Sequence, residues 1–82
     1  FRIEGHTDNI PTGPGSEFAS NWDLAAARAS SVLRYLTDYG VQESRFQLMS
    51  RAEFAPLYAN DTPEGRAYNR RVDVIILTEG TL

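Results

Sequence analysis

The segment that decides the fold is residues 20–40, which read SNWDLAAARASSVLRYLTDYG. Its leading Ser-Asn pair can cap a helix, Asp23 suits the positive end of the helix dipole, and Gly40 suits the left-handed residue that ends it. Apolar residues recur along one stripe at spacings of three and four. They are Trp22, Ala25, Ala29, Val32, Leu33 and Leu36. The pattern predicts a helix over residues 21–39, with Arg28 on the flank of its apolar stripe.

Three shorter stretches alternate apolar and polar residues with the period of two that predicts half-buried strands. They are residues 1–4 (FRIE), followed by a turn near His6, residues 45–50 (RFQLMS) and residues 71–77 (RVDVIIL). The apolar positions expected to share a face are Phe46 with Leu48, and Val72 with Val74 and Ile76.

Irregular and short elements connect these strands. Residues 8–20 contain two prolines and two glycines without a period, which predicts a loop whose length is more often functional than connective. Asp61 or Thr62 can cap a short helix with Pro63 in its first turn. Strands that alternate with helices predict a sheet with helices packed on a face, in an α/β or α+β two-layer sandwich.

Bulk properties exclude several classes of protein. The chain has 82 residues, a net charge of −3 and no cysteine. It therefore forms one domain, lacks the basic face of a nucleic-acid binder, and has neither disulfides nor thiolate chemistry. No run reaches the roughly 20 apolar residues of a membrane span. Because the chain starts at Phe1 in a strand-like segment, we interpret it as a fragment.

The sequence GHTD at residues 5–8 lies between the first strand and the long loop, where ligands commonly bind. Asp8 is either an anionic anchor or a turn residue, and local sequence alone favours the turn. His6 beside Asp8 suggests a general base, but it is the only histidine and no nucleophile or metal-binding motif accompanies it. We therefore expect no enzyme activity, no metal site and no cofactor.

All eight basic residues are arginines, which suit bidentate recognition of carboxylates. Arg28 is either a solvated helix residue or a guanidinium that a ligand carboxylate contacts, and local sequence again favours the former. Arg70 and Arg71 precede the last strand. They either form ion pairs with acidic residues or position Asp8.

Four motifs in order resemble the OmpA-like peptidoglycan-binding domain. They are GHTD at 5–8, N-x-x-L-x-x-x-R-A-x-x-V-x-x-x-L at 21–36, NDTPEGR at 60–66 and NRRV at 69–72. The match spans residues 3–77 and makes residues 1–82 a single domain. The resemblance implies an α+β two-layer sandwich of order β/α/β/α/β, with a mixed sheet and helices on one face. It also implies non-covalent binding of peptidoglycan.

In that family the Thr-Asp aspartate and the Arg-Ala arginine clamp the diaminopimelate residue of the stem peptide. The resemblance transfers these roles to Asp8, for the ammonium, and Arg28, for the carboxylate. A zwitterionic group needs one partner of each sign, and each charge-assisted bond contributes roughly 1.5 to 3 kcal/mol. Four further residues match positions expected to shape or buttress the pocket. They are Thr7, Asn21, Leu24 and Arg71.

Within the family, Pro11 in an enlarged loop and Ser20-Asn21-Trp22 before the helix resemble the flagellar motor stator subunit MotB. This branch implies a periplasmic domain of an inner-membrane-anchored protein that fixes the stator to the cell wall. Its motor partner would be MotA, contacted through an upstream membrane segment. Two alternatives stay open: an outer-membrane tether of the OmpA or Pal type, and an enzyme that acts on peptidoglycan through His6 and Asp8.

The sequence also departs from the family pattern. Ala25 stands where serine is common, and Ala52 where glycine often precedes the acidic residue, here Glu53. The strand and long helix that usually come before the segment starting at Phe1 are absent, so the domain reads as incomplete at its N-terminus. We therefore expect exposed apolar surface on the sheet and a homodimer.

Overall fold

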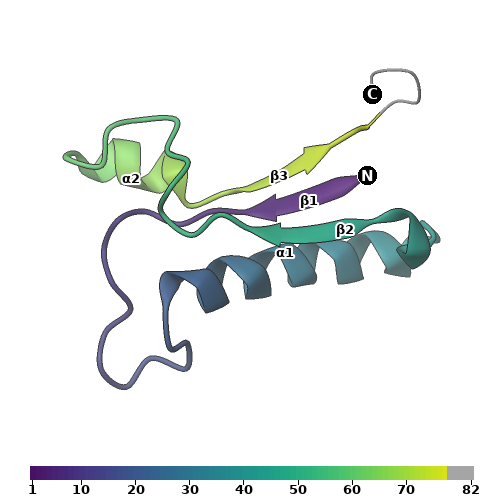
Figure 1. The fold of residues 1–82 in the computed structure, drawn as a ribbon, viewed down its shortest axis with the longest axis horizontal. Coiled ribbons are helices and arrows are strands. Elements are labelled where there is room, and N and C mark those ends of the chain that lie inside the picture. The colour runs from purple at the N-terminus through teal and green to yellow at the C-terminus, as the bar shows by residue number, and fades with distance from the viewer. Residues whose placement is uncertain (78–82) are drawn as a thin grey trace.

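The computed structural model describes residues 1–77, which form three strands and two α-helices (Figure 1). The elements are β1 (Arg2–Gly5), α1 (Asn21–Asp38), β2 (Gln47–Ser50), α2 (Pro63–Asn69) and β3 (Val72–Ile75). Their order is the one predicted. As predicted, the Ser20 side chain caps α1 and the Thr62 side chain caps α2.

Two strands are shorter than the sequence predicts, for different reasons. Arg45, the first residue of the second predicted strand, belongs to a 3₁₀ turn over Glu43–Arg45, and Phe46 caps that turn, so β2 begins at Gln47. β3 ends at Ile75 because Ile75 pairs with Arg2, the first residue of β1, so no partner strand continues beyond it. Strand length is therefore set by the pairing partner.

The sheet is mixed, with strand order β2-β1-β3. β1 runs parallel to β2 and antiparallel to β3. The register places Ile3 opposite Leu48 and Val74, so these three side chains share one face. These features confirm the α+β fold with a mixed sheet.

Helix α1 lies along this apolar face, against β1 and β2, whereas α2 lies beyond the end of the sheet near the start of β3 (Figure 1). Ile3, Ala25 and Ala29 are fully buried and form the core between helix and sheet. Neither helix within residues 1–77 has the length and hydrophobicity that crossing a membrane requires.

The predicted exposure of apolar sheet residues is confirmed. Leu48, Val74 and Ile76 are 47%, 49% and 69% exposed, although Leu48 and Val74 lie on the face that α1 covers. Because α1 packs mainly on β1 and β2, the apolar residues of β3 extend beyond the helix.

One position of the predicted buried stripe is wrong. Trp22 is 50% exposed, because it lies in the first turn of α1, and its ring contacts Phe54 at a centroid distance of 5.5 Å. The periodicity placed it correctly on the sheet side of the helix. It could not show that a loop residue, and not the sheet, would be its neighbour.

Candidate functional site

The close contact between β1 and α1 positions the site. A Cβ atom on Gly5 would lie 1.9 Å from the carbonyl oxygen of Ala25, so only glycine permits this approach. The same approach brings Arg28 to the end of β1, where its Nη1 donates to the His6 carbonyl oxygen over 3.4 Å. The small residues of α1 around Arg28 thus allow β1 to pack close to the helix.

Asp8 follows β1 and is buried, with two partners for its carboxylate. Oδ1 accepts the backbone N–H of Ile10 at 3.0 Å, and Oδ2 accepts Nη1 of Arg70 at 2.8 Å. The neighbouring Thr7 hydroxyl donates to the Asp8 carbonyl oxygen at 2.8 Å. Asp8 therefore has the turn role that its local sequence favours and is also one half of an ion pair. A carboxylate has about four lone-pair sites, so it can still accept a ligand donor.

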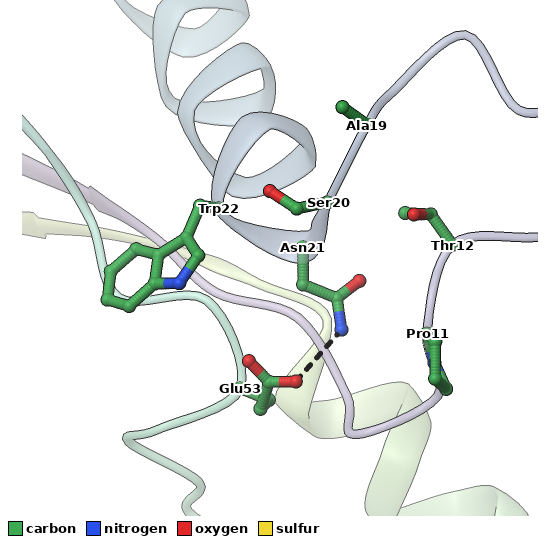
Figure 2. Close-up of a pocket in the computed structure, with 7 residues that line it drawn as sticks. All are labelled: Pro11, Thr12, Ala19, Ser20, Asn21, Trp22 and Glu53. Atoms are coloured by element: carbon green, nitrogen blue, oxygen red, sulfur yellow. Dashed lines mark hydrogen bonds between the residues drawn. The ribbon is translucent and has the colours of Figure 1, made fainter.

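Asn21 joins three segments at the first turn of α1. Its Nδ2 donates to the carbonyl oxygens of Asp8 (3.4 Å) and Ile10 (3.1 Å) and to Oε2 of Glu53 (3.2 Å; Figure 2). The side chain is only 6% exposed. Asn21 thus ties the long loop and the turn after β2 to the helix that carries Arg28.

Arg28 is a half-buried cation without an acidic partner in residues 1–77. No carboxylate there lies within 4.0 Å of its guanidinium, in contrast to Arg70. Leu24 precedes it by one helical turn on the same side of α1 and is half-buried. The site therefore presents a guanidinium and a carboxylate around the end of one strand.

The two arginines before β3 have separate roles. Arg70 is the partner of Asp8, whereas Nε of Arg71 lies 3.2 Å from both carboxylate oxygens of Asp73 and Nη2 donates to the Ala55 carbonyl oxygen. The sequence left two roles open for these arginines, which were ion pairing with an acidic residue and positioning of Asp8. Arg70 positions Asp8, and Arg71 pairs with Asp73. The structure does not bring Arg71 to Asp8.

A pocket of about 260 Å³ adjoins these residues at the start of α1 (Figure 2). Its wall is formed by the long loop, the first turn of α1 and the turn after β2. The lining residues are Pro11, Thr12, Ala19, Ser20, Asn21, Trp22 and Glu53. Asp8 and Arg28 do not line it. Asn21 belongs to both the pocket and the Asp8 network, so the two are contiguous.

His6 is 2% exposed, and its ring lies among charged groups. Its Nε2 is 3.3 Å from Asp73 and 3.8 Å from Glu4, and neither ring nitrogen has a hydrogen-bond partner in residues 1–77. Burial lowers the pKa of His6, as does the positive charge of Arg71, while Asp73 and Glu4 oppose that effect. No group of three metal-ligating side chains occurs in the described part of the chain.

The model of the OmpA family matches residues 1–70. The chain belongs to the OmpA family. Motility protein B of Bacillus subtilis is 42% identical over 79 residues, which are 95% of this chain and 30% of that protein. The peptidoglycan-binding protein ArfA of Mycobacterium tuberculosis is 40% identical over 74 residues, which are 90% of this chain and 21% of that protein. The domain therefore spans less than a third of either curated relative.

A solved structure of a MotB domain has the same fold. The crystallised C-terminal domain of Helicobacter pylori MotB superposes on this OmpA-family domain with a TM-score of 0.90 and 33% identity. The superposition covers 95% of this chain and 58% of that one. The predicted likeness to MotB is thereby confirmed.

Sequence reasoning did not assign two residues of the site. The sequence presents Arg70 only as one of a pair, and its position at the C-terminal end of α2 is what separates it from Arg71. For Glu53 the sequence shows only an acidic residue that follows Ala52. No local signal connects either residue with Asp8 or Asn21, because 62 residues separate Arg70 from Asp8 and 32 separate Glu53 from Asn21.

Proposed function

We propose that this domain binds the peptide stem of peptidoglycan non-covalently, with Asp8 accepting the ammonium of diaminopimelate and Arg28 donating to its carboxylate. The observation that supports this most directly is the half-buried Arg28, which lacks an acidic partner among residues 1–77 and whose Nη1 donates to the carbonyl oxygen of His6, two residues before Asp8. A partly buried cation without a counterion is costly unless a ligand supplies the negative charge.

The remaining predicted residues hold the two residues of the proposed clamp, Asp8 and Arg28, in place. Thr7 and Asn21 hold the backbone of Asp8, and Leu24 lies one turn before Arg28. Arg71, which the resemblance included, acts at a distance, through Asp73 and the loop carbonyl of Ala55.

Binding, with no bond cleavage, is the activity that these residues support. His6, the only histidine, is buried beside Asp73 and Glu4. Asp8 accepts hydrogen bonds from Arg70 and a backbone N–H, so its carboxylate already has two partners within the domain.

For the whole protein we propose a stator subunit, with this domain anchoring the motor to the cell wall from the periplasm. The likeness to the MotB proteins of Bacillus and Helicobacter supports this role. Many weak wall contacts by stators in one cell would hold firmly through multivalency. MotA would be contacted by a part of the protein outside residues 1–82. A tether of the OmpA type is the second candidate, favoured by the 40% identity over 73 residues to outer membrane protein A of Bordetella avium.

Co-sedimentation with purified sacculi tests the binding. We expect the domain to pellet with sacculi and to release no soluble muropeptides, whereas Asp8→Asn and Arg28→Ala lower affinity about ten-fold or more through the loss of a charge-assisted bond. Arg34→Ala is the matched control, because Arg34 is an exposed arginine on the same helix. Wild-type protein that stays in the supernatant would refute the proposal, and released muropeptides would refute a purely binding role.

We also propose that two copies associate through the exposed apolar residues of the sheet, Leu48, Val74 and Ile76. Analytical ultracentrifugation should show a concentration-dependent dimer that Val74→Glu abolishes. Tyr39→Glu, at the 74% exposed residue that follows α1, should leave it intact. A monomer at all concentrations would contradict dimerisation and leave the wall-binding proposal unaffected.

A further inference from the structure

The pocket beside Asn21 contains hydrogen-bond acceptors that no residue in 1–77 uses. Nδ2 of Asn21 donates hydrogen bonds to the carbonyl oxygens of Asp8 and Ile10 and to Glu53, which fixes the orientation of the amide. The amide oxygen Oδ1 consequently points to the opposite side, toward the loop that carries Thr12 (Figure 2). It forms no hydrogen bond within the described residues and is not one of their buried unpaired atoms, so it is open to a donor from solvent or a ligand.

Glu53 supplies a second free acceptor. One oxygen, Oε2, receives the Asn21 amide at 3.2 Å, and the other points toward Trp22 (Figure 2). No guanidinium within residues 1–77 lies within 4.0 Å of the Glu53 carboxylate, in contrast to Asp8. The pocket lining includes no cationic side chain. Such a surface repels a carboxylate and accepts N–H groups.

Trp22 gives the pocket an apolar wall. Its ring is 50% exposed, contacts Phe54 and lines the pocket beside Glu53. An indole face contributes contact area at little conformational cost. Acceptors on one side and an aromatic ring on the other match a short extended peptide, which carries N–H groups along its backbone and apolar atoms between them.

We propose that this pocket is a second subsite that receives the backbone N–H groups of the peptide joined to the zwitterionic residue in the clamp. This assignment rests on the proposed function, because it requires the ligand to be bound at Asp8. Asn21 joins Asp8 to the pocket. Glu53 and Asn21 accept the N–H groups, and Trp22 packs against the chain. The pocket would thus distinguish a stem peptide from free diaminopimelate.

Two ligands separate the subsite from the clamp: free diaminopimelate, and a tripeptide that ends in diaminopimelate. Calorimetry should show the tripeptide binding about ten-fold more tightly, from added N–H bonds of ordinary strength. A tripeptide with methylated peptide nitrogens should lose that gain. Trp22 is the only tryptophan, so its fluorescence should change with the tripeptide and not with free diaminopimelate.

Two variants provide the decisive comparison. Glu53→Gln keeps an acceptor for Asn21 and removes the charge, so it should weaken the tripeptide about five-fold more than it weakens free diaminopimelate. Trp22→Ala should show the same selectivity. Equal losses for both ligands, or no loss for either, would overturn the subsite, as would full affinity for the methylated peptide. Failure of wild-type protein to bind sacculi or free diaminopimelate, with the tripeptide still changing Trp22 fluorescence, would instead refute the clamp alone.

Discussion

The carboxylate of Asp8 and the guanidinium of Arg70 lie 2.8 Å apart, although 62 residues separate them along the chain. This ion pair joins the end of β1 to the end of α2, and it neutralises an aspartate side chain that is only 10% exposed. The same aspartate is the proposed anionic half of the ligand clamp. Arg70 therefore stabilises the charge that the ligand would use.

Replacement of Arg70 by methionine should lower the free energy of unfolding by about 1 kcal/mol, because Asp8 loses its counterion while the arginine is partly solvated. Urea denaturation measures the change. Arg34→Met removes an exposed arginine of α1 and should have little effect. Equal stability of the two variants would mean that the Asp8–Arg70 pair contributes nothing measurable.

Gly5→Ala should destabilise the domain by about 2 kcal/mol, the typical cost of overpacking. The new Cβ would lie 1.9 Å from the Ala25 carbonyl oxygen and would push α1 away from β1. Chemical denaturation gives the stability, and sacculus binding reports the displacement of Arg28. Gly13→Ala is the control, since nothing lies within 4 Å of a Cβ at that position. A stable Gly5→Ala variant that binds normally would show that the contact can relax.

Ala52→Gly should stabilise the domain by about 0.5 to 1 kcal/mol. Ala52 has φ of 47°, the left-handed region that disfavours a Cβ. Ala26→Gly, in the exposed middle of α1, should instead destabilise by about 1 kcal/mol. Thermal unfolding of both variants checks the opposite signs. A destabilised Ala52→Gly would mean that packing of the buried Ala52 methyl outweighs backbone strain.

Stability should decrease as the pH falls below 6.5, through His6. The pKa of His6 is lowered from 6.5 in the folded state by burial and by Arg71, so the unfolded chain binds the proton more readily. The contribution is complete above pH 6.5 and is lost as the pH falls from there to the lower folded pKa. Urea denaturation across this window measures the slope.

The control for that slope is His6→Gln, which removes the only histidine. Its free energy of unfolding should change less between pH 7 and the lower end of the window, whatever its absolute stability. The groups that face the ring are Glu4, Asp73, Arg71 and Arg51. An unchanged slope would show that His6 does not cause the pH dependence.

Local sequence was sufficient for the elements and most of their bounds. The caps at Ser20 and Thr62 and the four-residue spacing of Ala25 and Ala29 specify helices through contacts within a few residues. The ordered motifs, including GHTD and NRRV, specified the family and its candidate pair, Asp8 and Arg28. These features depend on short-range chemistry, which the order of residues contains directly.

The tertiary structure alone decided which side chains meet. It assigned Arg70 to Asp8 and Arg71 to Asp73, two neighbours that sequence reasoning could not separate. It also brought Glu53 to Asn21 beside an exposed Trp22. These contacts depend on strand register, on the close approach at Gly5 and on where α2 ends. Each joins residues far apart in the chain, so no local pattern encodes it.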